Sequence, residues 1–253
     1  MSPASSWLEA AARRGILTSR YPARPAAQEE IPLTGRPPRP VGGSVGTPEA
    51  VAACPVGALA ADGIDEGRCI RCARCLATGF EFRGPVETAR LRRDDLVVPY
   101  AAPARPEDAA APLVGLKRSL HIFLVDVGSC NACNLEVLAL ANPFYDATRL
   151  GLFFTNSPRH ADVLLVVGVP TEAMVDPLRR AYEAMPSPKA VLAVGVCPIS
   201  GGVFRGSAGL RSALSDVLPV DAFVPGCPPT PLQVLDGLLK LVGRSRPREA
   251  VPT

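Results

Sequence analysis

The chain contains eight cysteines and two histidines in 253 residues, so sulfur is its main candidate for metal or redox chemistry. Residues 1–15 lack the apolar stretch of an export signal, and we therefore expect the thiols to remain reduced. Reduced cysteines in this number favour metal binding over a disulfide framework. They fall into two groups of four, which are Cys54, Cys69, Cys72 and Cys75, and Cys130, Cys133, Cys197 and Cys227.

The first group joins a lone cysteine, Cys54, to a C-x2-C-x2-C run over residues 69–75. Bacterial ferredoxins carry C-x2-C-x2-C-x3-C-P runs, and in two-cluster forms the fourth cysteine of each run binds the other cluster. The remaining cysteine positions of that pattern hold Ser44, Thr47, Ala50 and Gly79. One complete ligand set survives, so residues 49–100 resemble a ferredoxin domain that has lost one of its two [4Fe–4S] clusters. A structural zinc site of four cysteines is the alternative.

The chain after residue 119 alternates β-like and helical patterns. Apolar runs predict strands at 120–127, 162–169, 190–196 and 222–225. Helical spacing predicts helices at 135–140, 177–185 and 232–242. Strands that alternate with helices predict an α/β fold built on a parallel sheet.

Each cysteine of the second group follows a predicted strand. Cys130 and Cys133 come after the first strand, Cys197 follows the third, and Cys227 follows the fourth. Because ligands bind beyond the carboxyl ends of the strands in open parallel sheets, we expect these four thiols to converge. Cys133 begins a helix and Cys227 precedes one, and the dipole at a helix start favours a thiolate. The alternatives are scattered buried thiols and a zinc site.

Five blocks in this region are similar to the small subunit of energy-converting, membrane-bound [NiFe] hydrogenases. They are GSCNACNLE at 128–136, NPFYD at 142–146, SPRHAD at 157–162, GVCP at 195–198 and PGCPP at 225–229. That family shares its fold with the B subunit of complex I, so the resemblance implies a flavodoxin-like parallel sheet domain over 119–243. It also implies that the second cysteine group holds a proximal [4Fe–4S] cluster beside a catalytic large subunit. Two residues separate Cys130 from Cys133, as in the hydrogenases, whereas the complex I subunit has adjacent cysteines.

The same resemblance implies roles for three further residues. Glu136 lies one helical turn after Cys133, which implies proton movement or partner contact near the cluster. Arg159 and His160 belong to a segment that faces the large subunit in the family, and Arg159 is expected to tune the cluster by hydrogen bonding. The alternatives are an exposed helix carboxylate for Glu136 and local loop structure for Arg159 and His160. No catalytic residue is expected on this chain.

We expect five segments along the chain. They are an N-terminal helix and an extended Pro/Gly-rich strap at 1–48, a ferredoxin-like α+β domain at 49–100, a linker at 101–118, the α/β domain at 119–243 and a tail at 244–253. The longest apolar run, 163–169, is much shorter than the roughly 18 residues of a membrane-spanning helix. A net charge of +3 is too small to indicate a nucleic-acid partner. The helical pattern at 1–21 either packs on its own domain or is an amphipathic foot on a membrane complex.

The resemblance implies an electron-transfer subunit with two [4Fe–4S] clusters in a membrane-associated complex of the [NiFe]-hydrogenase type. Its expected partners are a hydrogenase large-subunit-like protein, membrane-arm subunits and a ferredoxin or dehydrogenase donor, at the cytoplasmic side of the inner membrane. One alternative is a subunit of a nickel-free hydrogenase relative or of a complex I-like quinone oxidoreductase, because nickel ligands would lie on another chain. Another alternative is a zinc-stabilised assembly module without redox function.

Overall fold

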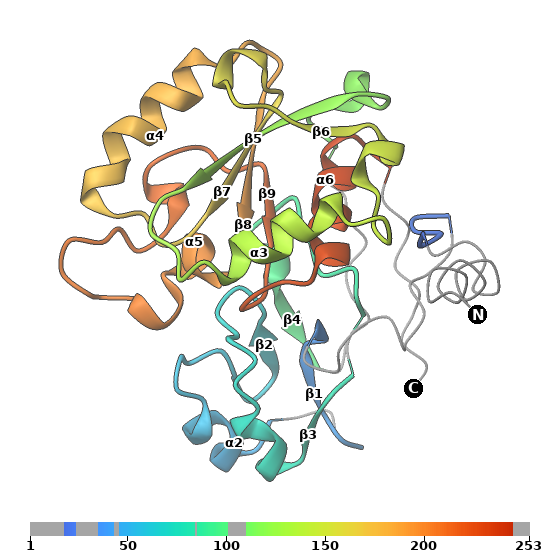
Figure 1. The fold of residues 1–253 in the computed structure, drawn as a ribbon. Coiled ribbons are helices and arrows are strands. Elements are labelled where there is room, and N and C mark those ends of the chain that lie inside the picture. The colour runs from blue at the N-terminus through green and yellow to red at the C-terminus, as the bar shows by residue number, and fades with distance from the viewer. Residues whose placement is uncertain (1–17, 24–34, 43–45, 84, 101–109, 245–253) are drawn as a thin grey trace, which may run out of the picture.

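The computed structural model describes residues 18–23, 35–42, 46–83, 85–100 and 110–244. Its largest element is a five-stranded, all-parallel sheet in the order β6-β5-β7-β8-β9 (Figure 1). The strands are β5 (Leu120–Asp126), β6 (Leu152–Phe154), β7 (Val163–Val167), β8 (Ala190–Val194) and β9 (Ala222–Val224). The predicted α/β fold with a parallel sheet is therefore confirmed.

Helices cover both faces of this sheet (Figure 1). They are α3 (Ala132–Leu138) and α6 (Pro231–Leu241) on one face, and α4 (Glu172–Ala184) and α5 (Val196–Ser200) on the other. Leu165 of β7 belongs to the first core and its neighbour Leu164 to the second, as the alternation of side chains along a strand requires. Every residue of β7 and β8 is buried, because both faces are covered. This centre supports the loops that leave the carboxyl ends of the strands.

A smaller unit precedes the sheet in sequence. It has two antiparallel strand pairs, β1 (Pro38–Pro40) with β3 (Phe80–Phe82) and β2 (Gly63–Asp65) with β4 (Val97–Pro99), and one helix, α2 (Pro48–Ala53). Its own apolar core contains Ala50, Leu59, Ile64, Cys75, Phe80 and Val98. β1 lies within the segment that was expected to be an extended strap, so part of that segment is a strand of this unit. The predicted domain boundaries themselves stay predictions.

Short 3-10 turns connect the main elements. They lie at Arg74–Thr78, Asp94–Leu96, Val114–Leu116, Ala139–Ala141, Ala147–Leu150, Pro158–His160, Gly202–Phe204 and Leu214–Asp216.

Close contacts join the smaller unit to the sheet. Arg90 and Phe223 exchange two backbone hydrogen bonds, of 2.9 and 2.7 Å, so the chain after β3 forms a bridge to β9. Ser200 of α5 donates its hydroxyl to the carbonyl of Gly67 at 2.8 Å. Because α5 begins beyond the carboxyl end of β8, this contact holds the loop after β2 at the carboxyl edge of the sheet, where the second cysteine group also lies.

Some elements differ from the sequence prediction. α4 begins at Glu172 rather than at Pro177, because Val175 and Leu178 are buried, and this packing outweighs the cost of an interior proline. The three-residue strand β6 and the five-residue helix α5 were not predicted, because elements of this length leave no clear periodicity. Most of the helix expected at 1–21, residues 101–109 of the expected linker and most of the tail lie outside the described residues.

Candidate metal centres

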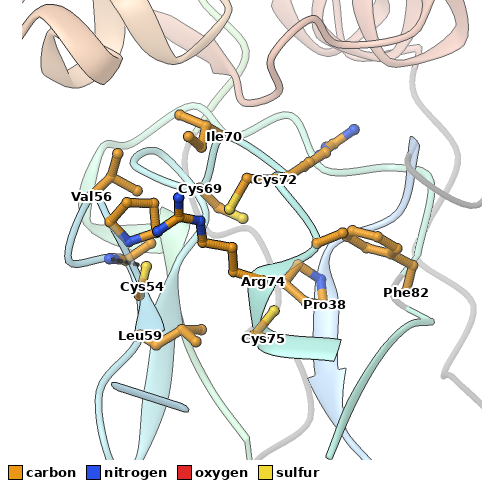
Figure 2. Close-up of a pocket in the computed structure, with 14 residues that line it drawn as sticks. Pro38, Cys54, Val56, Leu59, Cys69, Ile70, Cys72, Arg74, Cys75 and Phe82 are labelled. Atoms are coloured by element: carbon orange, nitrogen blue, oxygen red, sulfur yellow. Dashed lines mark hydrogen bonds between the residues drawn. The ribbon is translucent and has the colours of Figure 1, made fainter. Parts of the chain in front are cut away.

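The four cysteines of the first group surround one pocket in the smaller unit (Figure 2). Cys54 follows the last residue of α2, and Cys69 and Cys72 lie in the loop after β2. Cys75 is buried in the adjoining 3-10 turn. Apart from Arg71 and Arg74, apolar side chains complete the wall, among them Pro38, Val56, Leu59, Ile70 and Phe82. The fold thus brings together thiols that are up to 21 positions apart in sequence, as the difference between 75 and 54 gives.

The backbone of this loop presents N–H groups to the sulfurs. The N–H of Ala58 donates to Sγ of Cys54 at 3.2 Å, and the N–H of Arg71 donates to the thiol of Cys69. Arg71 and Ala73 have φ angles of 54° and 66°, although neither is glycine. Residues in this region turn neighbouring N–H groups toward one side and build the concave sites that hold anions and iron–sulfur clusters. The loop is therefore shaped to surround a group that carries negative charge.

Burial in this pocket keeps the thiols protonated unless a positive charge lies beside them. Burial raises the pKa of Cys69 to about 12, against the opposing effect of Arg71 and with further contributions from Cys75 and Cys54. Burial also raises the pKa of Cys75, and its neighbours Cys72 and Cys54 add to that rise. Because metal ligation requires the deprotonated form, thiols with raised pKa values become ligands only when a positively charged metal centre stabilises their thiolates. The donor set fits a metal cluster.

The second group lies where strands β5, β8 and β9 end. Cys130 is in the loop after β5, and Cys133 is the second residue of α3. Cys197 is the second residue of α5, which follows β8 after Gly195. Cys227 lies between β9 and α6, whose cap is Thr230 with Pro231 at the first helical position. All four positions follow the carboxyl ends of parallel strands.

Close backbone approach draws these loops together. Gly195 has a φ of 94°, and a Cβ at this position would lie 2.7 Å from Sγ of Cys133. The N–H of Gly195 donates to the carbonyl of Val224 at 2.8 Å, and that of Val196 donates to Gly226 at 3.0 Å. The turns after β8 and β9 are thus hydrogen-bonded to each other, and the sulfur of Cys133 lies against the first of them.

The four thiols affect one another's protonation. Burial raises the pKa of Cys133 to about 12, with further contributions from Cys197, Cys227, Cys130 and Glu136. Burial raises the pKa of Cys197 to about 11, and Cys227 and Cys130 add to it. The pKa of Cys227 is raised by burial and by Cys130. As in the first group, these thiols become stable thiolates only around positive charge, so they also fit a metal cluster.

Asp126, at the end of β5, organises the loop that carries Cys130. Its Oδ1 accepts from the N–H groups of Gly128 and Ser129 at 2.9 and 2.8 Å. Its Oδ2 accepts from Ser129 Oγ and Asn134 Nδ2, both at 2.6 Å. Burial acts to raise the pKa of Asp126, but these hydrogen bonds outweigh it and hold the pKa below its usual value. Sequence reasoning missed this residue, because an aspartate at a strand end carries no distinct signal.

The other predicted site residues are divided between the two edges of the sheet. Glu136 is on α3 and is coupled to Cys133, and partial burial raises its pKa. Arg159 and His160 lie in the turn before β7, at the amino-terminal edge. The five residues of β7 span about 16 Å at about 3.3 Å per residue, so Arg159 is not beside the second cysteine group. The expected hydrogen-bonding role of Arg159 at that cluster has no support in this geometry.

Arg71 and Gln233 are two residues of the site that the sequence did not indicate. Arg71 lies between Cys69 and Cys72, and its guanidinium reaches the carbonyl of Pro225 at 3.3 Å. It also donates to Oε1 of Gln233 at 3.2 Å. A basic residue within a C-x2-C motif was the available signal for Arg71, but its distant partners could not be inferred from it.

The described part of the chain lacks two features, a site for a single metal ion and a membrane-spanning helix. No three His, Cys, Asp or Glu side chains there form a site for a single metal ion. None of the described helices is long and apolar enough to span a lipid bilayer.

Comparison with known proteins identifies relatives of the sheet domain. The model of the family described as NADH ubiquinone oxidoreductase, 20 Kd subunit, matches residues 130–241. The chain is 46% identical over 122 residues to a probable membrane-bound hydrogenase subunit of Pyrococcus furiosus, a match that covers 48% of this chain and 73% of the relative. The first cysteine group lies outside the range that the family model matches.

Two further matches each cover about half of this chain. Formate hydrogenlyase subunit 7 of Escherichia coli is 41% identical over 134 residues, which cover 53% of this chain and 52% of that protein. A chain in the structure of the membrane-bound sulfane sulfur reductase, an archaeal respiratory membrane complex, is 35% identical, with a TM-score of 0.46 over 51% of this chain and 71% of that chain.

Proposed function

The chain belongs to the family of the 20 kDa subunit of NADH ubiquinone oxidoreductase, and from this premise we propose that it is an electron-transfer subunit with two [4Fe–4S] clusters. It works within a membrane-associated complex of the [NiFe]-hydrogenase type, next to a large subunit that carries the catalytic site. It lies peripherally in that complex, on the cytoplasmic side of the membrane.

The convergence of four cysteines from three strand ends is the observation that carries this proposal. Cys130, Cys133, Cys197 and Cys227 come from separate loops, and the electrostatic coupling among them indicates that they are neighbours. The spacing between Cys130 and Cys133 is the hydrogenase-like one. These thiols hold the cluster next to the large subunit.

The first group supports a second cluster in the same chain. Cys54, Cys69, Cys72 and Cys75 line one pocket, and backbone N–H groups of Ala58 and Arg71 donate to two of the sulfurs. N–H donors stabilise charge on sulfur, and the apolar wall limits access of water. When bound, a [4Fe–4S] cluster takes up and gives back single electrons at a potential set by these surroundings.

Exposed apolar side chains on α3 suit the contact with the large subunit. Leu135 and Leu138 are 60% and 64% exposed on α3, the helix whose second residue is Cys133. Large exposed apolar side chains beside a cofactor site are typical of a surface that a partner covers. Glu136 lies between them in sequence, and we assign it to this contact or to proton movement beside the cluster.

Metal analysis of the complex tests the proposal. The complex is purified anaerobically through a tag on this chain, and iron, nickel and zinc are measured per copy of the chain. We expect about eight iron atoms for the two [4Fe–4S] clusters, in addition to the iron and the stoichiometric nickel of a [NiFe] site in the complex. The same eight iron atoms without nickel would move the function to the nickel-free or quinone-reducing branch. Zinc in place of iron would overturn electron transfer and leave an assembly module.

Paired variants assign the iron to the two groups. Cys72→Ser in the first group and Cys227→Ser in the second are each expected to lower the iron content to about half, because each removes one ligand of a different cluster. Both cysteines are exposed, so the substitutions disturb packing little. An unchanged iron content in either variant would exclude that group as a cluster site.

A further inference from the structure

Arg71 links the loop of the first cysteine group to the loop of the second. Its backbone belongs to the C-x2-C turn between Cys69 and Cys72, in the wall of the first pocket. Its Nη2 donates to the carbonyl of Pro225 at 3.3 Å, across 154 positions of sequence. Pro225 begins the turn that carries Cys227. One side chain therefore joins the two cysteine-bearing loops directly.

Gln233 holds the guanidinium in this place. Oε1 of Gln233 accepts from Nη1 of Arg71 at 3.2 Å and from the N–H of Thr230 at 3.0 Å. Its Nε2 donates to Thr88 and to the carbonyl of Gly35, both at 2.9 Å. The same Gly35 carbonyl accepts from Nη1 of Arg71 at 2.7 Å. Gln233 is fully buried, so these partners fix its orientation and, through it, the position of the charge.

The charged neighbours of Arg71 come from both groups. Cys69 of the first group and Cys227 of the second both act on the guanidinium, together with the carboxylate of Glu66. Burial is the main opposing effect and lowers the pKa of Arg71. Arginine remains cationic in such surroundings, because its ordinary pKa lies far above neutral pH. A permanent positive charge thus stands between the two sets of thiols.

We propose that Arg71 is a positioning residue shared by the two cluster sites, since it presents one fixed positive charge to both and holds their loops in register. This inference rests on the proposed function. Positive charge favours the more reduced, more negative state of a cluster, so Arg71 raises the reduction potential of both clusters. Arg74 also lines the first pocket and is expected to act on the first cluster.

Redox titration of the anaerobically purified complex, followed by electron paramagnetic resonance, tests this role. Arg71→Gln removes the charge and is compared with Arg71→Lys, which keeps it, and with Arg74→Gln as the matched control. We expect R71Q to change the reduced-to-oxidised ratio of both clusters at a fixed potential by about tenfold, a shift of about 59 mV to lower potential for a one-electron couple. R71K is expected to restore both potentials, and R74Q to move only the first.

The outcomes separate this inference from the proposed function. If the wild-type complex contains two clusters and R71Q leaves the potential of the second unchanged, the shared role of Arg71 is wrong while the proposed function stands. If R71Q does not assemble, spin–spin interaction between the two reduced clusters of the wild type decides. Split or broadened signals support adjacent sites, and two independent signals overturn the inference. A wild-type complex without two clusters would refute the proposed function itself.

Discussion

Gly195→Ala gives a direct test of the second cysteine group, because a side chain added at position 195 would meet the sulfur of Cys133. Its φ of 94° and ψ of 163° lie in a region that essentially only glycine adopts, and another residue there costs about 1–3 kcal/mol. The added methyl carbon would lie 2.7 Å from Sγ of Cys133, well inside van der Waals contact. Overpacking of this kind costs about 1–3 kcal/mol more.

The cost of overpacking the added methyl group against Sγ of Cys133 falls mainly on the metal-loaded state. A free thiol rotates away from the new methyl group, whereas a thiolate bound to iron cannot. At about 1.4 kcal/mol per tenfold change in an equilibrium constant, we expect the second cluster to be retained about 5- to 140-fold less strongly. The iron content should fall from about eight to about four per chain, and the first cluster should keep its signal.

Two glycines provide graded controls. A Cβ at Gly202 would lie 3.2 Å from Sγ of Cys197, and a Cβ at Gly206 would meet nothing within 4 Å, although both residues also have positive φ. We expect iron loss in the order Gly195→Ala, Gly202→Ala, Gly206→Ala. If Gly195→Ala retains the full iron content and both signals, Cys133 is not a ligand held in the observed orientation.

Three further predictions concern the loop, the core and the partner surface. Asp126→Asn replaces a carboxylate that accepts four hydrogen bonds with an amide whose NH2 group repels two of the donors. We therefore expect the free energy of unfolding in urea to fall by about 1–3 kcal/mol and the iron content at the second site to be lower. Asp236→Ala leaves the buried ammonium of Lys240 without the carboxylate 3.6 Å away, and the free energy of unfolding should fall by about 3–5 kcal/mol. Leu135→Ser with Leu138→Ser should leave unfolding unchanged within about 0.5 kcal/mol and reduce co-purification of the large subunit.

Matched controls come from exposed positions. Arg211→Gln breaks an exposed ion pair with Glu172, at 3.0 Å, and should change the free energy of unfolding by less than about 1 kcal/mol. Val97→Ser removes an exposed apolar side chain from β4 in the smaller unit and should not affect co-purification. An Asp236→Ala variant as stable as Arg211→Gln would show that the buried pair adds no stability. Equal co-purification after the α3 and Val97 substitutions would exclude α3 as the partner surface.

The parts of the molecule that follow from local patterns were predictable. Buried parallel strands are continuous apolar runs, so β7 and β8 were found with ends that differ by a few residues. The helix start at Thr230 and Pro231 follows from capping chemistry. β6 was missed because three residues give no period, and the start of α4 was misplaced because a proline more often begins a helix than continues one.

The positions of charged side chains around the cysteines were not predictable. Arg159 was expected near the second group because it lies in a motif, but motif membership does not specify the sheet edge, and Arg159 precedes β7. Arg71 reaches Pro225 only because the smaller unit docks at the carboxyl edge of the sheet. Contacts between residues 154 positions apart depend on tertiary docking, which no local pattern encodes.

The docking between the two units determines how the two cysteine groups are related. In an assembly of separate subunits, the distance between two redox centres varies with each interface. Here Arg90 and Phe223 are joined by backbone hydrogen bonds, and the ammonium of Lys240 binds the carbonyl of Ala89 inside the junction. Buried polar contacts of this kind are costly to break, since each leaves an unpaired group. The geometry between the groups is therefore a property of this chain, and it should persist whichever large subunit the chain binds.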